Sequence, residues 1–258
     1  MNTQRLIVVD RFRDEIEALS LEQPGGLERW RASGRPVEGG RGRSLRVELP
    51  TSRMAVHLRP LWHGGWLQRL TGRRFLGTTR SENELEVATR LRAAGAPVPE
   101  PVLVFARRRG LFWHIDVGTR FVEQSRSLAK VLADADADDA LEAAQAAGHG
   151  VRSFHDAGGS HHDLHTGNLV IQTSVATLVD LDGARRLATV SSSRRMQELM
   201  RFDRSLRKRH GARPDLDSIR AAFLDAYTRD DATLRSQLDA YAGRERIRNT
   251  LHRLAWRS

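Results

Sequence analysis

The sequence predicts an α+β protein in which a small antiparallel sheet precedes a mainly helical part. Alternation of apolar and polar residues dominates as far as residue 122, and helical periodicity dominates from residue 123 onward. Between the two helical stretches of the second part lies a group of polar residues over 161–183. We therefore predict a boundary after residue 122, which separates a first lobe of residues 1–122 from a second lobe of residues 123–258.

Length and composition are typical of a globular protein with a sizeable core. The 258 residues are 40% hydrophobic and 29% charged. No run of about 18 apolar residues is present, so a membrane role would have to be peripheral. Cysteine is absent, which excludes disulfides and cysteine-ligated metals and is typical of a reducing cytoplasm.

The charge balance is strongly basic, at +10, and all but two of the 42 basic residues are arginine. A coding bias toward G and C would produce this composition without any functional selection. The functional interpretation is attraction to an anionic surface or substrate, such as phospholipid or lipopolysaccharide. Aromatic residues make up only 6% and no zinc-finger or RNA-binding pattern occurs, so no nucleic-acid partner is expected.

The first lobe is expected to contain five strands and a short helix over residues 11–22, which follows the first strand. The strands are predicted over residues 6–9, 45–49, 54–59, 102–106 and 111–121. Before the second strand, Gly39, Gly40 and Gly42 form a glycine-rich turn. In a kinase such a turn lets backbone N–H groups approach the phosphates of ATP, but glycine turns also arise for purely conformational reasons.

Arg59 is the candidate phosphate-binding side chain of the first lobe. Alternation along residues 54–59 places Met54, Val56 and Leu58 on one face and Arg59 on the other. Kinases usually carry a lysine at such a position, and arginine keeps its positive charge while adding a planar fork. The alternative is an exposed basic residue on an edge strand.

Two further elements of this lobe allow two interpretations each. A helix is predicted over residues 81–94, in which Ser81 and Glu84 match a capping box; Glu84 could instead form an ion pair with Arg59. Residues 66–74 interleave Trp66 and apolar residues with arginines. That segment could lie on an anionic membrane or pack locally as a helix with a solvated arginine face.

The second lobe is expected to be built from helices around one hairpin. Helices are predicted over 127–132, 139–156, 193–208, 215–229, 231–241 and 243–256, with a loop over 133–139. Strands over 169–171 and 177–179 form the hairpin. Asp215 and Asp217 follow Pro214 and are predicted to cap the helix that begins there.

The central motif has the spacing Asp-x₄-Asn-x₁₁-Asp, with Asp163, Asn168 and Asp180. Phosphoryl transfer of the protein-kinase type needs a carboxylate beside the acceptor hydroxyl and then two oxygen ligands for the metal bound to ATP. Asp163 is therefore the candidate base, while Asn168 and Asp180 are candidate ligands of Mg²⁺, which prefers hard oxygen donors. Singly, each could be an ordinary turn residue; jointly, their spacing predicts a bilobal protein-kinase-like fold.

Three histidines within the motif raise the alternative of a zinc site. His161, His162 and His165 lie in a turn and lack the spacing of a zinc-binding helix, and no cysteine is available. The zinc interpretation is therefore disfavoured, and His161 is interpreted as a structural residue of the loop.

The sequence resembles the lipopolysaccharide kinase family, and especially its 3-deoxy-D-manno-octulosonic acid (Kdo) kinases. The resemblance extends from about residue 39 to residue 210. It is carried by Glu38-Gly39-Gly40-Arg41-Gly42, Leu58-Arg59, His63-Gly64-Gly65, Gly95-x-Pro97-Val98-Pro99, Gly110-Leu111-Phe112, Arg126-Ser127-Leu128-Ala129, the loop from His161 to Asn168, Val179-Asp180-Leu181-Asp182 and Ser205-Leu206-Arg207-Lys208.

The resemblance implies ATP-dependent phosphorylation of a Kdo hydroxyl on a lipid A precursor, at the cytoplasmic face of the inner membrane. It implies that Asp163 is the base, that Asn168 and Asp180 bind Mg²⁺, and that Arg59 and Glu84 hold the phosphates of ATP. The implied partners are the anionic glycolipid Kdo–lipid A and an anionic membrane surface that the protein contacts peripherally.

Several alternatives stay open at this point. Asp182 occupies the position of a glycine in the usual kinase motif, so Asp182 could share metal binding with Asp180. The acceptor could be another core sugar, such as heptose. An aminoglycoside-type phosphotransferase would recruit carboxylates for a cationic acceptor, whereas this chain is rich in arginine. A non-catalytic pseudokinase would require the loss of a motif residue, and none is missing.

Overall fold

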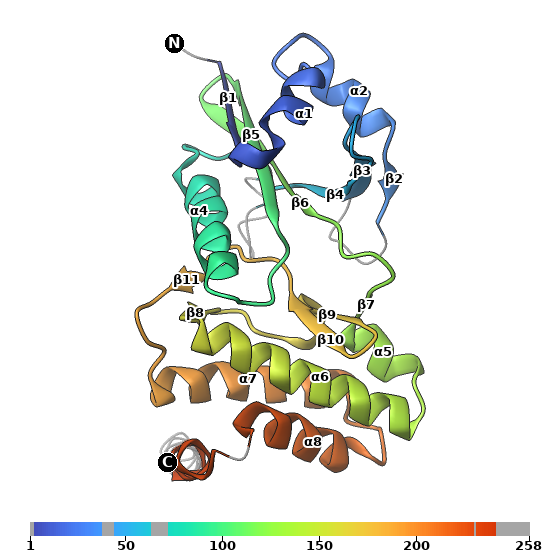
Figure 1. The fold of residues 1–258 in the computed structure, drawn as a ribbon, viewed down its shortest axis with the longest axis vertical. Helices are drawn as coiled ribbons and strands as arrows, with labels where there is room; N and C mark the ends of the chain where they lie inside the picture. The colour runs from blue at the N-terminus through green and yellow to red at the C-terminus, as the bar shows by residue number, and fades with distance from the viewer. Residues whose placement is uncertain (1–2, 38–43, 63–71, 230, 241–258) are drawn as a thin grey trace, which may run out of the picture. The chain divides into compact units, whose positions relative to one another are not determined.

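A computed structural model of the chain describes residues 3–37, 44–62, 72–229 and 231–240 (Figure 1). The chain divides into two compact units. The first comprises Met1–Arg90 and Pro99–Val122, and the second comprises Leu91–Val98 and Glu123–Ser258. The glycine-rich turn with Gly39, Gly40 and Gly42, residues 63–71 of the basic segment, and the helix expected over 243–256 lie outside the described residues.

The first unit is built on one six-stranded sheet in which every pair of neighbouring strands is antiparallel. In spatial order the strands are β1 (Gln4–Val8), β5 (Pro101–Arg109), β6 (Phe112–Arg120), β4 (Ala55–Pro60), β3 (Leu45–Glu48) and β2 (Arg35–Pro36). The five predicted strands are present. The sixth, β2, has only two residues and no alternating pattern, which is why the prediction of a five-stranded sheet missed it.

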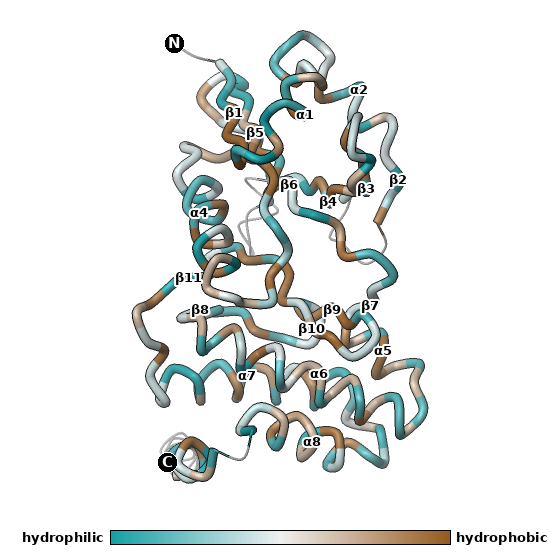
Figure 2. Tube along the Cα trace, viewed as in Figure 1, coloured by the Kyte–Doolittle hydropathy of each residue, from teal (hydrophilic) through white to brown (hydrophobic). Residues whose placement is uncertain are grey.

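Each face of this sheet buries a separate apolar cluster. On one face, residues of the 3-10 turn η1 (Asp10–Phe12) and the helices α1 (Arg13–Ala18) and α2 (Gly26–Ala32) pack against Val56 and Phe105. On the other face, Leu85 of α4 (Thr79–Ala93) packs with Val104 and Ile115. Figure 2 shows the hydrophobic colouring that recurs along β5, the strand that serves both clusters. Successive residues of a strand point to opposite faces of the sheet, and on both faces apolar residues are buried.

The start of α4 differs from the prediction. The helix begins at Thr79, so Ser81 lies inside its first turn and donates its hydroxyl hydrogen to the carbonyl oxygen of Thr78 at 2.7 Å. The capping box predicted for Ser81 and Glu84 is therefore wrong, and the Thr78 hydroxyl instead donates to the carboxylate of Glu82. Glu84 is consequently not engaged in capping.

The second unit consists of long helices beneath short strands. Its helices are α5 (Leu128–Asp134), α6 (Ala137–Asp156), α7 (Ser192–His210) and α8 (Leu216–Thr228), and residues 232–240 are also helical. Its strands are β7 (Arg126–Ser127), β8 (Gly159–Ser160), β9 (Leu169–Gln172), β10 (Val175–Leu178) and β11 (Arg185–Arg186), and η2 (Thr166–Asn168) is a 3-10 turn. The β9–β10 hairpin confirms the one predicted on either side of residue 174.

Two predicted loop and cap assignments in this unit are wrong. Only Ala135 and Asp136 separate α5 from α6, because the Asp136 carboxylate accepts a hydrogen bond from the Asp139 N–H and begins the helix earlier than expected. Asp215 occupies the N-cap position of α8, but its side chain makes no capping hydrogen bond. Its carboxylate instead accepts hydrogen bonds from the guanidinium of Arg213 at 2.7 and 2.8 Å.

Helix α6 is the centre of the second unit and lies between the β9–β10 hairpin and α8 (Figure 1). Small side chains allow this close packing. A Cβ atom at Gly148 would lie 2.3 Å from the carbonyl oxygen of Phe223 in α8, so the two helices can approach only because this position is glycine. No helix among the described residues is both long and apolar enough to cross a membrane.

Candidate active site

The predicted catalytic loop begins where α6 ends. Gly158 has φ of +85° and turns the chain out of the helix. A Cβ atom there would lie 2.2 Å from the carbonyl oxygen of Leu187, so a side chain is excluded on two grounds. The next residues form β8, which pairs with β11 and leads directly into His161.

His161 joins the two ends of the motif. Its Nδ1 accepts a hydrogen bond from the backbone N–H of Asp163 at 3.1 Å, which assigns the ring proton to Nε2. Nε2 then donates to the backbone carbonyl of Asp180 at 2.8 Å. The histidine is buried, with 1% of its surface exposed. One imidazole therefore ties the backbone at Asp163 to the backbone at Asp180, and both lie in the second unit.

The Asp163 side chain is accessible, with an exposed fraction of 67%. Its Oδ2 lies 3.7 Å from Nε2 of His165. The Gly167 N–H donates to Nδ1 of His165 at 3.0 Å, so the proton of that ring lies on Nε2, facing the carboxylate. Burial lowers the pKa of His165, and repulsion by Arg209 acts in the same direction, against the attraction of Asp163. The carboxylate therefore has a neutral N–H neighbour and an open side.

Asn168 and Asp180 are brought together by the β9–β10 hairpin. The side-chain amide nitrogen of Asn168 donates to the backbone carbonyl of Asp163 at 3.1 Å. The backbone N–H of Val179 donates to the backbone carbonyl of Asn168 at 2.8 Å. The first contact leaves the Asn168 Oδ1 on the opposite side of the amide as an oxygen donor. Asp180 has φ of +60°, a conformation that aspartate tolerates at some cost and that is concentrated at functional sites.

This donor set suits a metal that arrives with its own ligands. No group of three or more His, Cys, Asp or Glu residues in the described ranges could hold a metal ion. One amide oxygen and one carboxylate, at Asn168 and Asp180, instead fit Mg²⁺, which keeps water and binds substrate phosphates through few protein ligands. His161, His162 and His165, which are all described, are therefore not arranged as a three-ligand zinc site.

In the first unit, Arg59 and Glu84 form the ion pair considered for them. The guanidinium Nη2 of Arg59 donates to Oε1 of Glu84, and the two side chains are 17% and 6% exposed. Arg59 lies on β4 at a position that faces α4, as alternation along the strand predicts. The functional assignment of the pair as the holder of the ATP phosphates stays a prediction.

The sequence did not reveal a buried polar network that supports the loop. Glu198 of α7 accepts hydrogen bonds from the Ser160 hydroxyl at 2.6 Å and from the His161 N–H at 2.9 Å. It also accepts one from Nε2 of His155 at 3.1 Å. Glu198 lies four residues before the buried Phe202 and eight before the buried Leu206, so it is on the apolar face of its helix. A single acidic residue on such a face was the sequence signal that could have indicated a buried, hydrogen-bonded carboxylate.

Tyr227 completes this network from α8. Because Nε2 of His155 donates to Glu198, its Nδ1 accepts from the Tyr227 hydroxyl, at 2.7 Å. Burial raises the pKa of Tyr227 to about 12, so the hydroxyl keeps its proton. Burial lowers the pKa of His155, although hydrogen bonding to Glu198 and its charge oppose that shift. The network thus fixes α6, α7 and α8 against the start of the loop with His155 neutral.

The protein is expected to lose stability as the pH falls through the His155–Glu198 network. Below the unfolded pKa of about 6.5, the unfolded chain binds a proton at His155 that the folded chain, with its lowered pKa, does not bind. Burial raises the pKa of Glu198, but the hydrogen bond and charge of His155, together with hydrogen bonds from Ser160 and the His161 N–H, outweigh burial and lower this pKa in the folded protein. Further stability is therefore lost as the pH falls below 4.5. Urea unfolding between neutral pH and about pH 5 measures the first of these slopes.

His155→Gln is the variant for this test, since its amide can still donate to Glu198 and accept from Tyr227. We expect a shallower pH slope than in the wild type. His149→Gln changes an exposed histidine of the same helix and serves as the control with an unchanged slope. Equal slopes for the wild type and His155→Gln would contradict the assignment.

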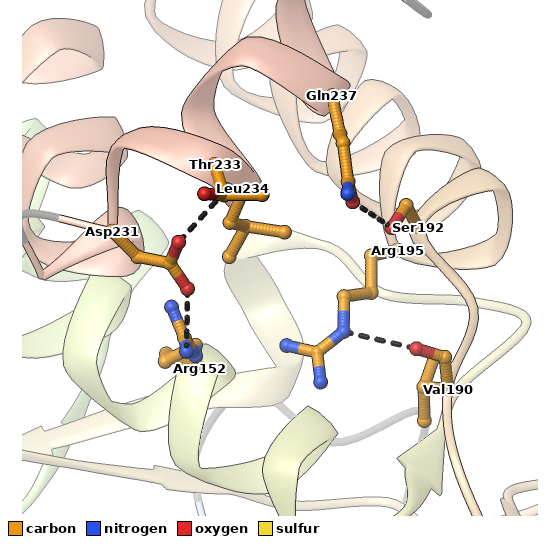
Figure 3. Close-up of a pocket in the computed structure, with 8 residues that line it drawn as sticks. All are labelled: Arg152, Val190, Ser192, Arg195, Asp231, Thr233, Leu234 and Gln237. Atoms are coloured by element: carbon orange, nitrogen blue, oxygen red, sulfur yellow. Dashed lines mark hydrogen bonds and ion pairs between the residues drawn. The ribbon is translucent and has the colours of Figure 1, made fainter.

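A pocket of about 250 Å³ elsewhere in the second unit contains none of the predicted site residues (Figure 3). Its polar groups contact one another. Arg152 lies 3.4 Å from Asp231, the Ser192 hydroxyl donates to Gln237 at 2.5 Å, and Nε of Arg195 donates to the Val190 carbonyl at 3.1 Å. These contacts attach the helix over 232–240 to α6 and α7, so we assign the pocket a structural role.

Comparison with known proteins gives relatives over most of the chain. It is 30% identical over 241 residues to a 3-deoxy-D-manno-octulosonic acid kinase of Stenotrophomonas maltophilia, covering 86% of this chain and 91% of that protein. It is 32% identical over 239 residues to the protein of the same name from Xanthomonas axonopodis pv. citri, covering 86% and 88%.

Among solved structures, the fold is similar to that of WaaP in a complex with acyl carrier protein. The TM-score is 0.51 at 15% identity, and the match covers 93% of this chain and 98% of the other. At this identity the likeness concerns the fold, and it confirms the predicted α+β kinase-like class. The model of the lipopolysaccharide kinase (Kdo/WaaP) family matches residues 27–227. The chain therefore belongs to the lipopolysaccharide kinase (Kdo/WaaP) family.

Proposed function

We propose that this chain is a Kdo kinase, which transfers the γ-phosphoryl group of ATP to a hydroxyl of a Kdo sugar on lipid A or the lipopolysaccharide inner core. Family membership and relatives named for this activity support the reaction and the sugar. The observation that carries the proposal for this chain is the double hydrogen bond of His161, which joins the backbone of Asp163 to that of Asp180.

Asp163 is the proposed base. Its exposed carboxylate would accept a hydrogen bond from the sugar hydroxyl, orient that oxygen toward the γ-phosphorus and take the proton as the new P–O bond forms. The neutral His165 beside it offers an N–H to the carboxylate and adds no cation to the site. The proton thus moves from the acceptor oxygen to an oxygen of Asp163.

Asn168 and Asp180 are the proposed ligands of Mg²⁺, through Oδ1 and the carboxylate. The bound ion would neutralise charge on the phosphates of ATP. Asp180 is preferred over Asp182 because the His161 contact fixes its backbone. On the nucleotide side, Arg59 would hold the phosphates, with Glu84 keeping its guanidinium in place. Backbone N–H groups at Gly39, Gly40 and Gly42 would complete the phosphate contacts.

The proposed acceptor is anionic, as Kdo carries a carboxylate and lipid A carries phosphates. The arginine-rich composition of the chain suits such an acceptor better than the cationic acceptor of an aminoglycoside phosphotransferase. For such a glycolipid acceptor, the proposed location of the protein is the cytoplasmic side of the bacterial inner membrane, where it would be held peripherally.

The test is an assay with purified protein, ATP and Mg²⁺, read by mass spectrometry of the acceptor. We expect one phosphate on Kdo–lipid A and none on lipid A without Kdo or on kanamycin. Fragmentation should assign the phosphate to the Kdo ring. Phosphate on heptose of a longer core, or transfer to kanamycin, would instead support the alternative acceptors, and no transfer to any of them would contradict the kinase assignment.

A further inference from the structure

A second pocket lies in the first unit, on the sheet face opposite the one that carries the Arg59–Glu84 pair. On β6, Ile115 points to the sheet face that α4 covers, where it packs in the apolar cluster. The next residue, Asp116, therefore points to the opposite face, which α2 covers. The pocket has a volume of about 630 Å³. It is lined by Glu28, Arg31, Ala32, Pro36, Leu45, Arg73 and Arg107. The proposed phosphate-holding pair is therefore not part of it.

Among the described residues, three arginines converge on this pocket and pair with two carboxylates. Arg31 and Arg73 both contact Asp116, at 2.5 Å and at 3.2 Å, and Asp116 is almost fully buried. Arg107 forms an ion pair with Glu28. Burial lowers the pKa of Arg73, and repulsion from Arg31 and Arg107 adds to this, against the attraction of Asp116. The pocket consequently has an excess of positive charge at its wall.

The arginines also keep donors that their protein partners do not use. Within the described residues, Nη2 is the atom of Arg73 that contacts Asp116, and the buried Nε of Arg73 has no hydrogen-bond partner. An unmade hydrogen bond of a buried charged group is costly, and it shows that the donors of this arginine cluster exceed the acceptors that the protein offers them. Arginine presents its N–H groups as a planar fork that matches the oxygens of a phosphate.

The remaining wall of the pocket is apolar and accessible. Ala32 and Pro36 are exposed and Leu45 is half-buried, so water meets an apolar strip beside the arginines. A free inorganic anion would use only the arginine side. A ligand with a phosphate and an adjoining hydrocarbon part would use both sides, because its apolar portion would bury Pro36 and Leu45.

We propose that this pocket binds the phosphomonoester headgroup of an anionic lipid, with Arg73 and Arg107 on the phosphate and Pro36 and Leu45 against the start of the acyl chains. Binding there would hold the first unit at a membrane surface. The site lies on a different face of the sheet from Arg59 and does not depend on the proposed reaction.

The experiment uses the full chain and vesicles of three parts phosphatidylcholine to one part phosphatidic acid, with binding measured by co-sedimentation. The test variant is Arg73→Gln with Arg107→Gln. Its control is Arg74→Gln with Arg108→Gln, which has the same net charge but alters the chain neighbours of the two arginines, neither of which lines the pocket. We expect binding of the test variant to weaken at least about tenfold, and that of the control to stay near the wild type.

Each outcome decides the proposal. Equal weakening in both double variants would mean that net charge alone attracts the vesicles, and the pocket assignment would be overturned. Absence of wild-type binding would overturn it as well. Inorganic phosphate that binds in calorimetry, without any vesicle binding, would assign the pocket to a soluble phosphate instead.

Folding of the test variant is checked by thermal unfolding, since Arg73 contacts the buried Asp116. If the double variant does not fold, Arg107→Gln alone replaces it, with Arg108→Gln as its control. Glu28, the partner of Arg107, is 51% exposed, so the single change leaves no buried charge behind. Weaker vesicle binding of Arg107→Gln than of Arg108→Gln would support the pocket, and equal binding would contradict it.

Discussion

Replacing Asp163 with asparagine is expected to lower kcat by about 10²- to 10⁴-fold, the usual contribution of a positioned general base. The amide has nearly the same shape but cannot take the proton of the acceptor hydroxyl at neutral pH. Backbone contacts of Asp163 with His161 and Asn168 involve its N–H and carbonyl, so they survive the change. Steady-state kinetics with Kdo–lipid A and saturating ATP measure the effect.

Stability should hardly change in this variant, because the Asp163 side chain is largely exposed. Asp217→Asn is a matched control, since that side chain is 92% exposed in the same unit and pairs with Arg220 on its own helix. Its activity should equal that of the wild type. Activity of Asp163→Asn within a few-fold of the wild type would remove Asp163 from the mechanism.

Replacing Arg59 with methionine should lower kcat/KM for ATP by about 10²- to 10³-fold, as expected for the loss of one preorganised group on the transferred phosphate. The change also removes the guanidinium that pairs with the buried carboxylate of Glu84, and breaking a buried pair in this way typically costs about 3–5 kcal/mol of stability. Kinetics at varied ATP and urea unfolding of the same preparation separate the two effects.

Arg59→Lys distinguishes the functional role from the structural one. Lysine restores the charge and a partner for Glu84, so we expect recovery of most stability and a large part of the activity. Arg90→Met removes an exposed arginine that pairs with Glu86 on α4, and should leave both quantities unchanged. An Arg59→Met protein that is less stable but fully active would restrict Arg59 to a structural role.

Local patterns were sufficient for most of the fold. Alternation along residues 54–59 placed Arg59 on the face opposite Val56, and the structure has it there. The apolar runs on either side of residue 174 predicted the β9–β10 hairpin, because strands need only period-two side chains and a turn between them. The spacing of Asp163, Asn168 and Asp180 likewise identified the loop before its geometry was known.

Helix ends were predicted less well, because several neighbouring polar side chains can compete to accept hydrogen bonds from the free N–H groups at a helix start. Ser81 and Glu84 matched a capping box in sequence, yet the helix begins two residues earlier at Thr79. In the same way Asp136 starts α6 and shortens the expected loop. Asp215 is drawn instead to the neighbouring guanidinium of Arg213.

The sequence by itself determined the fold class and the motif of Asp163, Asn168 and Asp180, because both depend on periodicity and spacing along the chain. It also indicated the family, through the resemblance of its motifs to those of known kinases. Only the tertiary structure decided what surrounds them. Glu198 reaches His161 across 37 positions, and Asp116 meets Arg31 across 85. Such contacts join residues that are far apart in sequence and follow no repeating pattern along the chain. They form only when the burial of apolar faces has brought the helices and strands together.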